Sequence, residues 1–147
     1  MKIVIFSIIF ILSTLSFASD QCEKMNVSGV QFFSPIDVVV KELGPFSKKV
    51  YFKDIETSGQ HSGWRLIRPG LEVFIADIGG LTYAHVTDAK ITVAGEYKVN
   101  GKAPESSGKS HVEIYPCTLP SITEQRVVLN LGLNGTIQSI TIEDYGL

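Results

Sequence analysis

Residues 64–75 read Trp-Arg-Leu-Ile-Arg-Pro-Gly-Leu-Glu-Val-Phe-Ile and decide the fold, because they predict a pair of antiparallel strands. The apolar side chains here follow a period of two, which is typical of strands. Between the two runs, Pro69 fixes φ at the second position of a type II turn, and Gly70 supplies the positive φ at the third. The stretch therefore predicts a β-hairpin made of residues 64–67 and 71–75.

The period of two continues toward the C-terminus. Four further strands are expected, at residues 81–87, 89–93, 96–99 and 111–115. Pro116 is expected to stop the last of them, because proline donates no hydrogen bond to a sheet. Residues 126–131 and 136–142 predict a second hairpin around Asn134-Gly135, a pair that is favoured in tight turns.

A short helix is predicted before the first hairpin, at residues 35–43. Ser34 suits the N-cap and Pro35 the first helical position, while Gly44-Pro45 ends the helix. Four apolar side chains at helical spacing share one face, namely Ile36, Val39, Val40 and Leu43. Because consecutive valines are poor helix formers, a strand is the competing interpretation. We expect an α+β domain, with one short N-terminal helix packed on an antiparallel sheet of about six to eight strands.

The composition of the 147 residues limits the classes of function. Hydrophobic residues make up 44% of the chain and charged residues 19%, and the formal net charge is −2. A chain of this composition is neither a disordered tail nor a coiled coil. Its slightly acidic balance excludes nucleic-acid binding driven by bulk positive charge, so no nucleic-acid partner is expected.

The N-terminus has the pattern of a signal peptide. Lys2 precedes a short apolar run, and Ser16-Phe17-Ala18 has the small-x-small form that signal peptidase reads. Cleavage near Ala18 would separate a leader, residues 1–18, from a single exported domain, residues 19–147. The apolar run is shorter than the ~20 residues of a membrane-spanning helix. We therefore expect a periplasmic or secreted protein that has no membrane anchor after cleavage.

The two cysteines, Cys22 and Cys117, fit an exported protein. Thiols oxidise in such compartments, and with two cysteines only one pairing is available. A redox role would need an activated pair such as Cys-x-x-Cys, which is absent. The sequence predicts a structural disulfide between Cys22 and Cys117.

Several local motifs follow one another along the chain: a helix ending in Leu43-Gly44-Pro45, a strand with Trp64, a Gly-Leu-Glu-Val-Phe strand at 70–74, a Val-x-x-Ala-x-Ile segment at 86–91 and the hairpin at 129–142. Together they resemble the helix-plus-hairpin unit of beta-lactamase-inhibitor-protein-like domains, a group that includes the small outer-membrane assembly lipoproteins of the SmpA/OmlA type. The chain departs from the pattern of that group in having no lipidated cysteine, a longer loop before the tryptophan and no recognisable second helix. The resemblance implies protein binding in the cell envelope and not catalysis.

Three patterns that could carry chemistry are better explained by structure. Residues 103–110 satisfy a permissive phosphate-loop pattern, but the strand predicted after them leaves no room for the helix that such a loop needs. The histidines, His61, His85 and His111, lack the spacing of zinc ligands. Ser62 stands one position away from the serine of a Gly-x-Ser-x-Gly nucleophile elbow. We therefore expect no catalytic residue, no metal site and no cofactor.

Two long connections rich in glycine, serine and charge, at 53–63 and 101–110, are the expected interaction loops. The residues expected to contact a partner are His61, Trp64, Ser107 and Lys109. Trp64 is included because it follows the first loop directly, where a tryptophan can anchor a partner. Packing in the core is the alternative for this side chain.

The expected function is that of a protein-binding domain whose unknown partner lies in the cell envelope or outside the cell. Its role would be that of an inhibitor, an immunity protein or an envelope-assembly protein. One alternative is a small secreted hydrolase with a site assembled by the fold, for which the candidate residues are Asp88, His111 and Glu113. Another is a structural component of the envelope.

Overall fold

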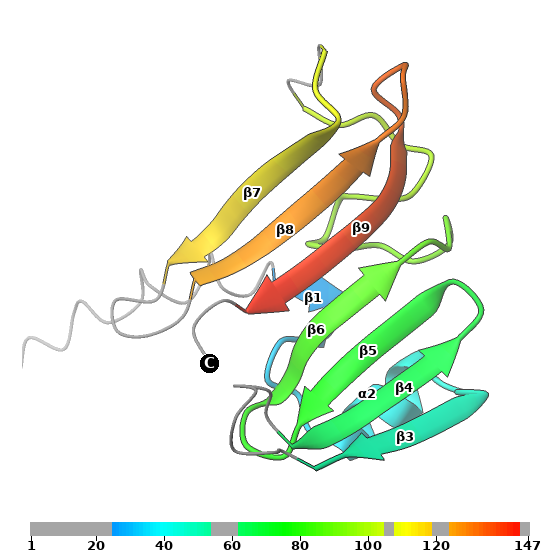
Figure 1. The fold of residues 1–147 in the computed structure, drawn as a ribbon, viewed down its shortest axis with the longest axis vertical. Coiled ribbons are helices and arrows are strands. Elements are labelled where there is room, and N and C mark those ends of the chain that lie inside the picture. The colour runs from blue at the N-terminus through cyan, green and yellow to red at the C-terminus, as the bar shows by residue number, and fades with distance from the viewer. Residues whose placement is uncertain (1–24, 54–61, 105–107, 119–123, 145–147) are drawn as a thin grey trace, which may run out of the picture.

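The computed structural model describes residues 25–53, 62–104, 108–118 and 124–144. Seven strands form one antiparallel sheet in the order β3-β4-β5-β6-β9-β8-β7 (Figure 1). They are β3 (Lys48–Phe52), β4 (Gly63–Arg68), β5 (Leu71–Ala76), β6 (Gly80–Val86), β7 (His111–Thr118), β8 (Glu124–Leu131) and β9 (Ile137–Asp144). A two-stranded sheet of β1 (Asn26–Val27) and β2 (Val30–Gln31) precedes the helix α2 (Ile36–Leu43). The described fold is broadly α+β and mostly β, as expected.

The core lies on one face of the seven-stranded sheet. A row of directly paired residues crosses five strands on this face: Leu66, Val73, Ala84, Ile142 and Val127. All five are 0% exposed. Their neighbours along each strand point to the other face and are partly exposed, because side chains alternate along a strand. The apolar period of two in the sequence thus reflects the burial of one face of the sheet.

The helix covers this buried face. Figure 1 shows α2 behind β4 and β5, and Val39 and Leu43 are its buried residues. The predicted helix is therefore confirmed, but the predicted N-cap is wrong. Pro35 occupies the N-cap position without a side-chain hydrogen bond. Ser34 lies outside the helix because its backbone carbonyl accepts a hydrogen bond from Leu81, at 2.9 Å.

The strands predicted at 89–93 and 96–99 do not form. Instead the chain turns after Val93, where Ala94 and Gly95 both have positive φ. Val93 and Tyr97 exchange two backbone hydrogen bonds across this turn. The alternating apolar residues of the segment are buried, among them Ile91, Val93 and Val99. Their period reflects this burial, while the pairing of the segment is limited to isolated bridges such as the one between Val93 and Val27 of β1.

Two edge strands differ from the prediction. β7 continues past Pro116 to Thr118, and a register shift between Ile114 and Cys117 accommodates the proline. β3 was not predicted, because four of its five residues are exposed and no apolar alternation marks it. In the described part of the chain, β3 and β7 are the two edges of the large sheet.

The predicted leader and Cys22 lie outside the described residues. Cys117 lies in β7, opposite Gln125 of β8. The signal peptide, the exported location and the disulfide all remain predictions. Among the described residues, no helix combines the length and apolar character needed to cross a membrane.

Candidate functional site

Exposed apolar side chains gather at one end of the large sheet. Of the seven large hydrophobic side chains exposed in the described segments, four belong to residues where β3 or β5 ends or where β4 or β6 begins, at one end of the sheet (Figure 1). A fifth, from the segment before α2, lies beside the start of β6 through a backbone hydrogen bond to Leu81. These five are Phe33, Tyr51, Phe52, Trp64 and Ile78. The other two, Tyr115 and Leu133, belong to β7 and to the turn between β8 and β9. A gathered set of exposed apolar groups marks an interaction site more often than scattered ones do.

A groove of about 430 Å³ lies at this end, on the face that carries the helix. It is lined by Phe33, Pro35, Ile36, Trp64, Ile75, Ala76, Asp77, Gly79 and Gly80. Trp64 and Ile75 are direct partners on β4 and β5 and form one side. The segment before α2 forms the other side, where it is held by the bond from Phe33 N–H to the Leu81 carbonyl, at 2.9 Å.

Gly80 permits the close approach of these two sides. A Cβ atom at this position would lie 2.4 Å from the backbone oxygen of Phe33. Its φ of +71° is also in the left-handed region, which glycine adopts without strain. Gly80, the first residue of β6, therefore allows the chain before the helix to lie directly against the sheet, and the groove forms along this junction.

Trp64, Tyr51 and Asp77 form a connected group on three neighbouring strands or their ends. The rings of Tyr51 and Trp64 have centroids 5.1 Å apart and are tilted by 58°. The Tyr51 hydroxyl donates a hydrogen bond to Asp77 Oδ2, at 2.5 Å. This bond raises the pKa of the Tyr51 hydroxyl above its ordinary value. Trp64 keeps 36% of its surface exposed, so it forms the wall of the groove and is not a fully buried core residue.

Of the four predicted contact residues, the structure describes Trp64 and Lys109, and these two lie far apart on the sheet. His61 and Ser107 lie outside the described residues. Lys109 is exposed and precedes β7. Because the strands are antiparallel, the start of β7 lies at the opposite end of the sheet from the start of β4, which carries Trp64 (Figure 1). The described ends of the two connections, Ser62 before β4 and Lys109 before β7, thus lie at opposite ends of the sheet.

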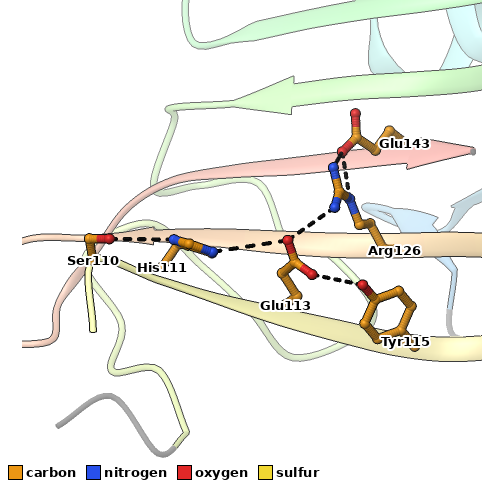
Figure 2. Close-up of polar contacts among 6 residues, drawn as sticks. All are labelled: Ser110, His111, Glu113, Tyr115, Arg126 and Glu143. Atoms are coloured by element: carbon orange, nitrogen blue, oxygen red, sulfur yellow. Dashed lines mark hydrogen bonds and ion pairs between the residues drawn. The ribbon is translucent and has the colours of Figure 1, made fainter. Parts of the chain in front are cut away.

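A polar cluster occupies the other face of the sheet, over β7, β8 and β9 (Figure 2). Arg126 lies between two carboxylates, 3.0 Å from Glu113 Oε1 and 2.5 Å from Glu143 Oε1. The Tyr115 hydroxyl donates to Glu113 Oε2 at 2.7 Å. That bond raises the pKa of Tyr115. Cross-strand pairs of this kind stabilise a sheet, and the cluster is explained by that role.

His111 extends the cluster toward Ser110, in the order that a hydrolase would need. His111 Nε2 lies 4.0 Å from Glu113 Oε1, and Ser110 Oγ lies 3.4 Å from His111 Nδ1. Both distances exceed the roughly 2.6–3.2 Å of an activated serine. All three residues are exposed, and Glu113 already forms an ion pair with Arg126, which it shares with Glu143. The geometry therefore gives no support for nucleophilic catalysis.

Asp88, the third residue of the hydrolase alternative, lies elsewhere. Its carboxylate accepts a hydrogen bond from the backbone of Lys90, at 2.9 Å, beside the turn at Gly70.

No protein-family model matches the chain, and neither does any curated protein or solved structure to which it was compared.

Proposed function

We propose that the chain is a protein-binding domain that contacts its partner through the aromatic groove, which we define by Phe33, Ile36, Trp64, Ile75 and Asp77. The observation that carries the proposal is the gathering of exposed apolar side chains at this end of the sheet. The proposed setting is the periplasm or the outside of the cell, in accordance with the predicted leader. There the domain would act as an inhibitor, an immunity protein or an envelope-assembly protein.

The exposure of the groove walls favours a protein over a small molecule. Phe33 is 40% exposed and Trp64 is 36% exposed. A pocket for a small molecule encloses most of its ligand, whereas these walls themselves face solvent. A protein surface can cover both the groove and its walls. Tryptophan at the centre of such a patch is among the residues that contribute most to protein–protein affinity.

The test compares two aromatic residues of the groove with a third exposed aromatic residue that lies outside it. The protein is used as bait under non-reducing conditions, in extracts of the envelope and in culture fluid of the source organism, and retained proteins are identified by mass spectrometry. Trp64→Ala should reduce capture of a stoichiometric partner at least ~10-fold, as expected for an interface anchor. Phe33→Ala, on the facing wall, should reduce it as well.

Tyr115→Ala is the matched control, because Tyr115 is 50% exposed and lies outside the groove. This variant should capture the partner as the wild type does. Circular dichroism melts of all three variants show whether each is folded. Full capture by folded Trp64→Ala, or equal loss in Tyr115→Ala, would contradict the proposal.

A further inference from the structure

The groove has one charged group among its described lining residues, the carboxylate of Asp77. Asp77 Oδ2 accepts the hydroxyl of Tyr51, at 2.5 Å. Within the described ranges, Asp77 forms no ion pair, and its Oδ1 accepts no hydrogen bond. An exposed carboxylate with one oxygen held by a neighbour presents its other oxygen in a fixed direction. It can accept a hydrogen bond from a ligand at little cost in side-chain ordering.

Trp64 places an aromatic surface beside this carboxylate. Tyr51 contacts the indole from the β3 side, whereas Ile75 and Ala76 continue the groove on the β5 side. An indole face is the best aromatic surface for a cation. Ile36 and Ile75 add apolar surface that suits the methylene stem of a long side chain.

We propose that the aromatic groove receives an arginine side chain of the partner protein. This inference rests on the proposed function, because it names the chemistry that the partner presents. The guanidinium group stacks on the indole of Trp64 and donates a hydrogen bond to Asp77 Oδ1, while its stem lies on Ile36 and Ile75. Arginine suits the site better than lysine, because its planar group can stack on a ring and donate in its own plane at once.

Other partner groups fit the groove less well. An acidic side chain would be repelled by Asp77, whose charge no described residue balances. A purely apolar side chain would cover the carboxylate and remove its hydration without replacing it. A cation on an apolar stem matches both the aromatic walls and the single charge of the groove.

The test uses Trp64 as a reporter, since it is the one tryptophan of the chain. The full protein is titrated with a capped Ala-Arg-Ala peptide while the emission of Trp64 is recorded. The control probe is the same peptide with citrulline, which has the shape of arginine without its charge. We expect a saturable change with the arginine peptide and binding of the citrulline peptide at least ~5-fold weaker, the size of an exposed ion pair.

Two variants test the role of the carboxylate. Asp77→Asn should abolish the preference for arginine over citrulline, whereas Glu96→Gln, at an exposed carboxylate outside the groove lining, should keep it. Tyr51→Phe removes the hydrogen bond to Asp77 but leaves its charge, so the preference should persist. Melting curves establish that each variant is folded.

The outcomes separate this inference from the proposed function. Equal binding of both peptides, no response to either, or an unchanged preference in Asp77→Asn would overturn the arginine site. If Trp64→Ala loses the natural partner while Asp77→Asn keeps it, the groove binds protein by another contact and the arginine site is wrong. If Trp64→Ala keeps the partner, the proposed function itself fails, even where the arginine peptide binds.

Discussion

Two glycines at tight turns share a left-handed backbone but differ in their surroundings. Gly70 has φ of +78° and Gly95 has φ of +75°. A Cβ atom on Gly70 would lie 2.5 Å from Cβ of Asp88, whereas nothing lies within 4 Å of such an atom on Gly95. A side chain at Gly95 would therefore cost stability only through its left-handed backbone. A side chain at Gly70 would add the cost of a steric clash.

Replacement of each glycine by alanine should give two different losses of stability. Gly95→Ala should lower the free energy of unfolding by ~1 kcal/mol, the cost of placing an L-residue in this region. Gly70→Ala should cost roughly 3 kcal/mol, because the neighbouring turn must also move. Urea unfolding followed by circular dichroism measures both values. Equal losses would show that the contact with Asp88 relaxes freely.

The site residues were only partly predictable at this scale. The sequence indicates Trp64 because this residue directly follows a loop rich in glycine and serine. Phe33 and Asp77 carry no motif. Asp77 lies beside Trp64 through the β4–β5 hairpin, where its N–H donates to the Ser62 carbonyl at 2.9 Å, whereas Phe33 meets Trp64 only because the segment before α2 lies against the start of β6. Such a meeting depends on tertiary packing, which local patterns do not contain. The sequence groups Lys109 with Trp64 because both adjoin long loops, yet the fold separates them.

At the scale of elements, prediction succeeded where periodicity and turn residues agreed. The hairpins around Gly70 and Gly135 form at the expected places, and both glycines have positive φ. Prediction failed where one or both of these signals were missing. β3 lacks apolar alternation because it is an exposed edge, and the segment around Val93 has the alternation of a strand but turns at Ala94.

The helix α2 should depend on packing more than on its own propensity, because it has eight residues and three consecutive valines. Leu43 is 3% exposed and belongs to the core, whereas the adjacent Glu42 is exposed and pairs with Lys41 at 3.4 Å. Leu43→Ala should therefore cost about 2–5 kcal/mol. Glu42→Ala should change stability by no more than ~0.5 kcal/mol.

Chemical denaturation of the two variants tests this difference. The pair is matched, because both substitutions introduce alanine at neighbouring positions of one helix and leave its propensity high. A loss below 1 kcal/mol for Leu43→Ala would mean that α2 contributes little to the fold. A large loss for Glu42→Ala would mean that its surface pair matters more than exposed ion pairs generally do.

At the scale of the whole molecule, one strand pairing joins two parts that the sequence predicted separately. β3 to β6 form successive antiparallel neighbours, as do β7 to β9. The pairing of β6 with β9 joins these two groups into one sheet. Ala84 lies opposite Ile142 and Val86 opposite Ile140, all of them fully buried. A pairing between segments so distant in the chain leaves no local signal. Apolar periodicity and turn residues therefore do not predict the order of the strands in the sheet.

The predicted disulfide would add a covalent connection on the same scale. Cys117 lies in β7, at one edge of the large sheet, while Cys22 precedes β1 in the sequence. A bond between them would close a loop of nearly 100 residues, which stabilises a fold by about 4 kcal/mol through the entropy of the unfolded chain. A reductant should therefore lower the melting temperature by at least several degrees.

The control for this prediction is the double variant Cys22→Ser with Cys117→Ser, in which both cysteines are replaced. It should melt at the temperature of the reduced wild type and should not respond to reductant, because it has no bond to lose. Identical melting of the oxidised and reduced wild type would contradict the prediction. It would mean that the β7 edge is held by the sheet and the core alone, through its pairing with β8 and the contacts of Val112 and Ile114 with the buried cluster.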